Sequence, residues 1–253
     1  MADILIYGCY GYTGKLIAEM CAERGVSALL SGRNPEKVKA LADATGLPGK
    51  AVDLDDAAGL DAILHETKVV LHCAGPFVRT YKPMLEACLR NKAHYLDITG
   101  EIDVFEGVAN VTEKAKAAGI MAMPGVGFDV VPTDCVAAHL KNELPDATDL
   151  ELVIKSVRGG ISHGTASTMV LSLGEGSKVR RDGKLVKIGA GKPTITVDLG
   201  RGPTQAAGIP WGDLVTAWHT TGIPNITTYV SVPKGQIRML KFSNAQITHT
   251  FSK

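Results

Sequence analysis

Aromatic side chains are scarce in this sequence, and neither sign of charge predominates. Phe, Trp and Tyr make up 5% of the 253 residues, and 27 Lys and Arg residues face 26 Asp and Glu residues, which gives a formal net charge of +1. Single-strand nucleic-acid binders combine basic grooves with aromatic stacking platforms, and a near-neutral chain has no field that attracts polyanions. We therefore expect no nucleic-acid partner and no membrane-surface partner.

Disulfide, export and membrane signals are also missing. The five cysteines are an odd number without a C-x-x-C pair, which is typical of reduced thiols in the cytoplasm. No run of about 18 apolar residues occurs, so we expect no membrane span. The first apolar run begins within a few residues of Met1, which leaves no room for a signal peptide. These observations predict a cytoplasmic protein.

Two catalytic signatures are absent as well. The seven histidines are scattered, without H-E-x-x-H or the Cys/His spacing of metal ligands, so no metal site is predicted. No Tyr-x-x-x-Lys occurs, so the catalytic pair of short-chain dehydrogenases is missing. Metal-dependent and short-chain chemistry are therefore both disfavoured.

What the sequence does contain is a glycine-rich turn near its beginning. The apolar run 4–7 reads as a buried parallel strand, and Gly8, Gly11 and Gly14 follow with G-x-x-G-x-x-G spacing. An apolar pattern of helical period begins at Lys15. A strand, a glycine turn and a helix together form a phosphate cradle, because the helix N-terminus presents free N–H groups to an anion.

The next strand end indicates which dinucleotide is bound. In folds that bind NAD, an acidic residue about 20 positions after the glycines accepts the ribose 2′-hydroxyl. Here the predicted strand 26–30 ends instead in Ser31, Arg33 and Asn34. A guanidinium matches a phosphate with a planar fork. The site is therefore predicted to prefer NADP(H) over NAD(H), with Arg33 on the 2′-phosphate.

Strands and helices alternate through the first half of the chain. Further strands are predicted at residues 50–54, 68–73, 94–98 and 120–123, and their alternation with helices predicts an α/β fold with a doubly wound parallel sheet over residues 1–145. After residue 145 the pattern favours a smaller, mostly antiparallel α+β domain over residues 146–253. There we expect a helix at 164–179, a hairpin turn at 181–184, and strands at 150–157, 195–197, 214–218 and 226–232.

Several motifs resemble one known family. They are Gly8-x-x-Gly11-Tyr12-Thr13-Gly14, Ser31-Gly32-Arg33-Asn34, Cys73-Ala74-Gly75-Pro76-Phe77, Tyr95-Leu96-Asp97-x-x-Gly100-Glu101 and Gly127-Phe128-Asp129-x-x-Pro132-x-Asp134. In this order they resemble the saccharopine dehydrogenase-like NADP-binding family, and more narrowly its branch of oxidoreductases and trans-acting enoyl reductases. The resemblance implies a Rossmann domain with an inserted α+β domain for substrate or dimerisation, shortened here at the C-terminus.

The resemblance also implies roles for individual residues. The pyrophosphate would be held by Tyr10, Gly11, Tyr12, Thr13 and Gly14, and the 2′-phosphate by Ser31, Arg33 and Asn34. The adenine would lie against Asp53 and Leu54. The nicotinamide ribose would lie against Cys73, Ala74, Gly75, Pro76 and Phe77. Each set follows a predicted strand, which is where ligands bind in open α/β sheets.

The reaction that fits is hydride transfer between NADP(H) and a C=C, C=O or C=N bond of a small or carrier-bound metabolite. Such a reduction also needs a proton donor, and the candidates near the expected cleft are Tyr81, Lys82, Asp129 and His163.

Two alternatives remain at this point. A protein that binds NADP(H) only to regulate would need no proton donor. A hydrolase would use Ser162 of Gly160-Ile161-Ser162-His163-Gly164, which matches G-x-S-x-G but lies outside the doubly wound half. Uncovered strand edges in the second domain make a homodimer an open expectation.

Overall fold

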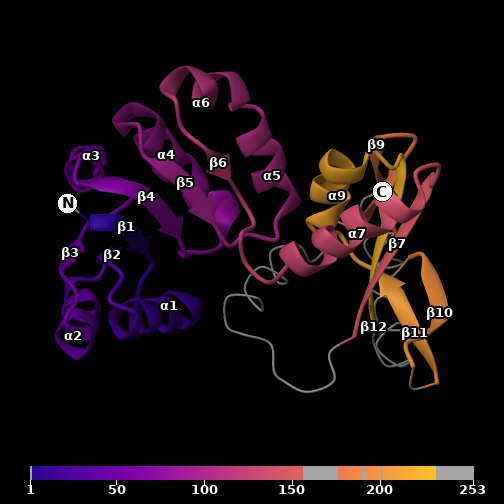
Figure 1. Ribbon diagram of the computed structural model, residues 1–253, viewed down its shortest axis with the longest axis horizontal. Helices are drawn as coiled ribbons and strands as arrows, with labels where there is room; N and C mark the ends of the chain where they lie inside the picture. Colours follow the sequence, from indigo (N-terminus) through magenta and orange to yellow (C-terminus); the bar gives the residue numbers. More distant parts are fainter. Residues whose placement is uncertain (1, 156–175, 190–191, 201, 232–253) are drawn as a thin grey trace, which may run out of the picture. The chain divides into compact units, whose positions relative to one another are not determined.

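A computed structural model describes residues 2–155, 176–189, 192–200 and 202–231 (Figure 1). Within it the chain divides into two compact units, Met1–Asp129 and Val130–Lys253. His163 and the G-x-S-x-G motif lie outside the described residues. The division falls after Asp129, so the helix at 131–143, which precedes the predicted boundary at residue 145, is counted with the second unit.

The first unit contains one six-stranded parallel sheet, which confirms the predicted doubly wound fold. Its strand order is β3-β2-β1-β4-β5-β6. The order reverses between β1 and β4, and ligands of such sheets bind in the crevice outside the carboxyl ends at this point. The strands are β1 (Ala2–Tyr7), β2 (Ala28–Gly32), β3 (Gly49–Ala51), β4 (Thr67–His72), β5 (His94–Asp97) and β6 (Ala122–Met123).

Six helices connect or follow these strands: α1 (Tyr12–Glu23), α2 (Pro35–Thr45), α3 (Ala57–Leu64), α4 (Phe77–Asn91), α5 (Ile102–Ala109) and α6 (Thr112–Ala118). The segment between β5 and β6 contains two helices, α5 and α6, rather than one continuous helix. The Thr112 hydroxyl donates to the Ala109 carbonyl at 2.6 Å and competes with the backbone for that acceptor. Val111 has φ −103° and ψ 13°, outside helical values, which ends the first helix.

The core of the first unit lies on both faces of the sheet. On one face, Leu5 packs with Met84 of α4 and with other buried residues of α3 and α5. On the other face, Ile6 packs with Ala18 of α1 and Leu41 of α2. Neighbouring strand residues point to opposite faces, so a strand covered on both sides must be apolar throughout. This is why run 4–7 predicted a buried parallel strand correctly.

The second unit contains a mostly antiparallel sheet, as the sequence predicted. The strand order is β10-β11-β12-β8-β9, and β7 pairs in parallel with β12. Helices α7 (Val131–Glu143) and α9 (Asp213–Thr221) pack against each other. The strands are β7 (Asp149–Ile154), β8 (Ser177–Arg181), β9 (Lys184–Ile188), β10 (Thr194–Asp198), β11 (Pro203–Gly208) and β12 (Asn225–Ser231).

One predicted element of the second unit is wrong, and another is contradicted at its end. The run 214–218 was predicted as a strand and forms part of α9, because Leu214, Val215 and Ala217 are buried together, which suits a helix face and not a strand that alternates. The helix predicted at 164–179 falls largely on residues outside the described ranges, and its last three residues belong to β8. The predicted hairpin turn is confirmed: Asp182 and Gly183 have φ 47° and 75° between antiparallel β8 and β9.

Candidate cofactor site

The glycine turn joins the ends of β1, β2 and β4. Gly8 has φ 81°, and its N–H and that of Cys9 donate to the Ser31 carbonyl at 2.9 and 3.1 Å. A Cβ on Gly8 would lie 2.8 Å from the backbone nitrogen of Ala74. Only glycine therefore suits this position, both for its backbone conformation and for the close approach of the β4 loop.

Helix α1 leaves its N-terminus open to an anion. Among the described residues, no side chain of its N-cap residue Gly11 or of its first turn supplies a cap, and the first turn contains no acidic residue. Gly14 is buried against the carbonyl of Gly8, so the helix begins directly behind the turn. Its first N–H groups, at Tyr12, Thr13 and Gly14, lack intrahelical acceptors. This is the geometry that binds a phosphate at a helix N-terminus.

Of the three residues predicted at the end of β2, two use their side chains within the fold. Ser31 is fully buried, and its hydroxyl donates to the Lys50 carbonyl of β3 at 2.7 Å. The Asn34 carboxamide oxygen accepts the Lys37 N–H at 2.9 Å and caps α2. Arg33 is exposed, and within the described ranges it makes no ion pair. Arg33 is therefore the side chain available to a phosphate here.

Tyr10 and Lys37 complete this end of the site. The Tyr10 ring lies against Gly32, where a Cβ would be 2.7 Å from ring atom Cε1, and its hydroxyl accepts the Asn34 N–H at 3.3 Å. Lys37 Nζ lies 5.7 Å from the centroid of the same ring. Lys37 thus adds a cation at the Tyr10 ring, in the first turn of α2. It was not predicted from the sequence, although its place in the first turn of α2 was a signal.

The predicted adenine side follows β3. Asp53 accepts the Asp55 N–H on its carboxylate at 3.1 Å and the Asp56 N–H on its carbonyl at 3.2 Å, which folds residues 53–56 into a turn. The Asp56 carboxylate then caps α3 through the Gly59 N–H at 2.9 Å. Leu54 is partly buried against the core. The turn therefore presents Asp53 and Leu54 at the carboxyl edge of the sheet.

The loop 73–77 lies at the end of β4, next to the glycine turn. The Cys73 N–H donates to the Tyr7 carbonyl at 2.7 Å, and Ala74 is the residue that contacts Gly8. Burial raises the pKa of the Cys73 thiol to about 12, so Cys73 stays a neutral thiol at physiological pH. The loop ends at Pro76, the N-cap residue of α4, and Phe77 begins the helix. Cys73 therefore has a structural role in this loop and does not act as a nucleophile.

A buried histidine supports the same loop. His72 Nε2 lies 3.0 Å from Thr80 Oγ1, and the Thr80 hydroxyl donates to the Ala74 carbonyl at 2.6 Å. Because the Thr80 proton is used there, the hydroxyl oxygen accepts, and His72 Nε2 carries its hydrogen. Burial lowers the pKa of His72 to about 3, so the ring is neutral. His72 was not predicted from the sequence, because it ends an apolar strand without any motif around it.

A second set of hydrogen bonds connects the loops after β4, β5 and β6. The buried Asp97 carboxylate accepts from the Tyr95 hydroxyl at 2.6 Å and from the N–H groups of Thr99 and Gly125 at 3.0 and 2.8 Å. Burial raises the pKa of Asp97 above its usual value. The Glu101 carboxylate accepts the N–H groups at residues 77 and 78, both at 2.8 Å. This role for Glu101 was not predicted from the sequence.

Three of the four predicted proton donors are among the described residues, and they lie in different surroundings. Tyr81 is 6% exposed in the core, with its hydroxyl against Gly107 of α5. Lys82 is exposed on α4, with Nζ 6.0 Å from the Tyr81 ring centroid. The Asp129 carboxyl is half-buried against Gly100, and burial raises its pKa. Because His163 is outside the described residues, Asp129 is the candidate that combines a strand-end position with a perturbed pKa.

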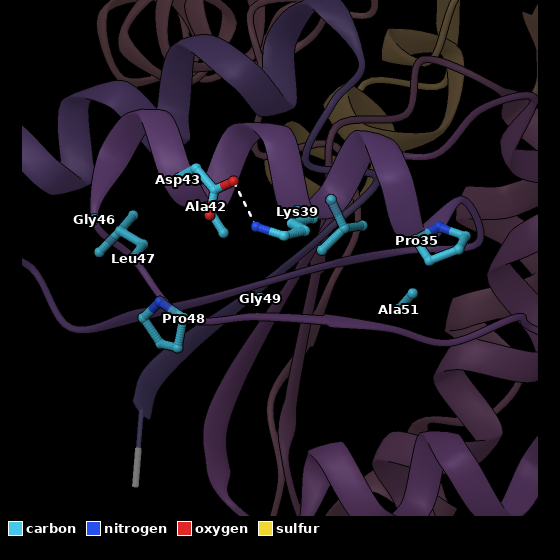
Figure 2. Close-up of a pocket in the computed structure, with 10 residues that line it drawn as sticks. Pro35, Lys39, Ala42, Asp43, Gly46, Leu47, Pro48, Gly49 and Ala51 are labelled. Atoms are coloured by element: carbon cyan, nitrogen blue, oxygen red, sulfur yellow. Dashed lines mark hydrogen bonds and ion pairs between the residues drawn. The ribbon is translucent and has the colours of Figure 1, made fainter.

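One surface depression lies away from these residues. It is lined by α2 and β3 together with the segment between them, and Lys39 and Asp43 form an ion pair of 2.7 Å beside it (Figure 2). Its lining contains none of the residues predicted to bind the cofactor. In the described part of the chain, no cluster of three or more His, Cys, Asp or Glu residues is arranged to hold a metal. The helices described there include none that is long and apolar enough to span a membrane.

Comparison with known proteins finds a family match within the first unit. Residues 4–123 match the model of the saccharopine dehydrogenase NADP binding domain. Over these residues the chain is similar to that family. The match reaches every strand of the first unit's sheet and agrees with NADP(H) as the predicted cofactor.

Two curated relatives are similar over a longer stretch. The trans-acting enoyl reductase of Mycobacterium bovis is 29% identical over 219 residues, which are 81% of this chain and 52% of the relative. The trans-acting enoyl reductase of Mycobacterium leprae is 34% identical over 167 residues, 61% of this chain and 40% of the relative. The chain thus spans about half the length of these relatives.

A solved structure extends the fold comparison to both units. Apo saccharopine dehydrogenase (L-Glu forming) from Saccharomyces cerevisiae superposes with a TM-score of 0.70 at 16% sequence identity. The alignment covers 95% of this chain and 57% of the yeast chain. At this identity the likeness concerns the fold, and it shows that a saccharopine dehydrogenase fold extends beyond the matched segment.

Proposed function

We propose that this protein is an NADP(H)-dependent oxidoreductase that transfers a hydride between the cofactor and a C=C, C=O or C=N bond of a small or carrier-bound metabolite. The observation that carries the proposal is the open N-terminus of α1 at the reversal of strand order, with Arg33 where NAD-binding folds have an acidic residue. The family match over residues 4–123 supports the cofactor, and the relatives named trans-acting enoyl reductases favour reduction of a C=C bond.

The residues at the strand ends fit each part of NADP(H). The first N–H groups of α1 bind the pyrophosphate, and Arg33 pairs with the 2′-phosphate. The turn at Asp53 and Leu54 receives the adenine, and the loop 73–77 lines the nicotinamide ribose. The fit rests on features already present: Gly8 leaves room for the chain to approach, and the Arg33 guanidinium has no competing ion pair among the described residues.

The chain's own contribution to the chemistry is orientation and a proton. The nicotinamide, when bound, supplies the hydride from C4. Reduction of a double bond also requires a proton on the atom next to the one that receives the hydride. Asp129 is proposed to donate it, because a carboxyl group with a raised pKa remains protonated at a higher pH than an exposed one. The neutral thiol of Cys73 leaves the reaction without a covalent nucleophile on that loop.

The proposal is tested by calorimetric titration with NADPH and NADH of the wild-type protein and the Arg33→Ala variant. A charge-assisted hydrogen bond contributes about 1.5–3 kcal/mol. Arg33→Ala should therefore weaken the binding of NADPH by that amount and leave the binding of NADH almost unchanged. Arg24→Ala, which removes an exposed arginine after the end of α1, is the matched control and should change neither affinity.

Two results would count against the proposal. Absence of binding by both cofactors would make the glycine turn a structural feature only. Tight NADPH binding without hydride transfer to any enal, ketone or imine tested would leave a protein that binds the cofactor to regulate, and the catalytic part of the proposal would fall.

A further inference from the structure

The N-terminus of α4 is already occupied by a side chain from a distant part of the sequence. Glu101 Oε1 accepts the N–H of Phe77 and Oε2 accepts that of Val78, each at 2.8 Å. The N-cap residue of α4 is Pro76, whose side chain cannot accept a hydrogen bond. A carboxylate at a helix N-terminus is stabilised both by these N–H groups and by the helix dipole.

Glu101 is itself held in place by the loop after β5. Its backbone N–H donates to Thr99 Oγ1 at 3.0 Å, and the Thr99 N–H donates to the buried Asp97 carboxylate. The same carboxylate accepts the Gly125 N–H of the loop after β6 at 2.8 Å. The Glu101 side chain therefore connects the beginning of α4 to a hydrogen-bonded network anchored in two neighbouring strand ends.

Two side chains, Thr80 and Glu101, hold the loop 73–77 and its entry into α4. The Thr80 hydroxyl lies 2.6 Å from the Ala74 carbonyl and 3.2 Å from the Pro76 carbonyl, with His72 behind it. The first two N–H groups of α4, at Phe77 and Val78, donate charge-assisted hydrogen bonds to Glu101. Loss of the Glu101 carboxylate would thus leave these two N–H groups without their acceptor, while Thr80 still holds the two loop carbonyls and the glycine turn remains supported.

We propose that Glu101 is a positioning residue that fixes the loop 73–77 for the nicotinamide half of the cofactor. It acts through the N–H groups of Phe77 and Val78 and leaves the adenine half, which α1, Arg33 and Lys37 serve, unaffected. This inference rests on the proposed function, because it assumes that NADP(H) binds at these strand ends. It further assigns the pyrophosphate to α1 rather than α4, since Glu101 fills the α4 N-terminus.

The test compares two ligands on the Glu101→Gln variant. Full-length NADPH reports on both halves of the site, whereas 2′,5′-ADP contains only the adenine half with the 2′-phosphate. Glutamine keeps the size of the side chain but offers one acceptor oxygen, so one of the two N–H groups loses its partner. We expect the dissociation constant of NADPH to rise about tenfold, because one charge-assisted hydrogen bond that holds the loop is lost. The dissociation constant of 2′,5′-ADP should change less than about twofold. The fluorescence of bound NADPH should also shift towards that of the free cofactor.

Glu86→Gln is the control, because Glu86 is exposed on the same helix, about two turns beyond Val78. It should bind both ligands as the wild type does. Glu101→Asp, which keeps the charge on a shorter side chain, is the second variant if Glu101→Gln does not fold. Equal losses for NADPH and 2′,5′-ADP in a folded variant overturn the inference, as does unchanged NADPH affinity and fluorescence. Failure of the wild-type protein to bind either ligand removes the proposed function itself.

Discussion

Burial of the Asp129 carboxyl group both destabilises the folded protein and supports the proposed role of Asp129 as a proton donor. Its carboxyl group is half-buried against Gly100, and no hydrogen-bond partner for it occurs among the described residues. Burial without compensation disfavours the charged form and raises its pKa. A group whose pKa is higher in the folded state contributes stability at low pH, and that contribution disappears as the pH rises through the folded-state pKa. At neutral pH, an ionised Asp129 therefore destabilises the fold.

The substitution Asp129→Asn should increase thermal stability at pH 7 and lose this advantage at pH 3. The amide is neutral at both pH values, whereas at pH 7 the acid must either ionise in its half-buried position or take up a proton on folding, and at pH 3 it is already neutral in both the folded and the unfolded chain. We expect a gain on the order of 2 °C in Tm at pH 7, which in a chain of this size corresponds to at most about 1 kcal/mol in the free energy of unfolding. The measurement is a pair of thermal melts at each pH. If Asp129 is the proton donor, the stabler variant should also lose turnover while it keeps NADPH affinity.

Asp146→Asn provides the comparison, because Asp146 is an exposed carboxylate outside any described strand or helix. Its melting temperature should differ from that of the wild type equally at the two pH values. A gain for Asp129→Asn of the same size at pH 3 would contradict the pKa explanation, since the acid is then neutral as well.

The residues at the end of β2 show what a local pattern can predict and what it cannot. Ser31, Arg33 and Asn34 were assigned to one phosphate, because all three follow a strand beside a glycine turn. The sequence does not reveal that the Ser31 hydroxyl is 2.7 Å from the Lys50 carbonyl, or that Asn34 caps α2. The Ser31 contact depends on the pairing of β2 with β3, whereas the Asn34 cap is a local contact that competes with the phosphate for the same side chain. The assignment of Arg33 to the phosphate stays a prediction.

At the scale of elements, the helices of the first unit differ in how their N-termini are satisfied. Asn34 caps α2, Asp56 caps α3, and Glu101 binds the first N–H groups of α4. Helix α1, which follows the glycine turn, receives no such side chain from the described residues. The glycine spacing predicted this open end from sequence, because none of the three glycines has a side chain to fill it. The occupied end of α4 required a residue 24 positions further along.

The β8–β9 hairpin tests how much one turn glycine contributes to the second unit. Gly183 has φ 75°, and a Cβ placed on it would lie 3.2 Å from Trp218 Cη2. Gly183→Ala should therefore cost the left-handed strain of an alanine, about 1–2 kcal/mol, together with displacement of the Trp218 ring. Urea unfolding measures the change in the free energy of unfolding.

Gly222 separates the two contributions. It has φ 66° at the end of α9, and a Cβ placed on it would have no described atom within 4 Å, so Gly222→Ala should cost the backbone strain alone. Equal losses for the two variants would mean that the Trp218 contact adds nothing. A smaller loss at Gly183 would contradict the packing argument.

At the scale of the whole molecule, the fold could be predicted from the sequence where elements that follow one another in the chain are also neighbours in space. The strands of the first unit alternate with helices, and this regularity predicts a parallel sheet whose carboxyl ends share one edge. In the second unit, β7 pairs in parallel with β12, so Asp149 lies beside Asn225. A pairing between such distant segments leaves no local signal.

The first unit should fold and bind the cofactor without the rest of the chain. Residues 1–129 contain the whole parallel sheet, both of its packed faces, and all residues proposed here to contact NADP(H). A domain with its own core on both faces of a sheet is expected to unfold cooperatively. Expressed alone, this fragment should show a single thermal transition and bind 2′,5′-ADP with the affinity of the full chain, and Arg33→Ala in the fragment should weaken that binding. A fragment that folds but does not bind would mean that the second unit supplies part of the adenine site, whereas an unfolded fragment would mean that the core of the first unit is incomplete without Val130–Lys253.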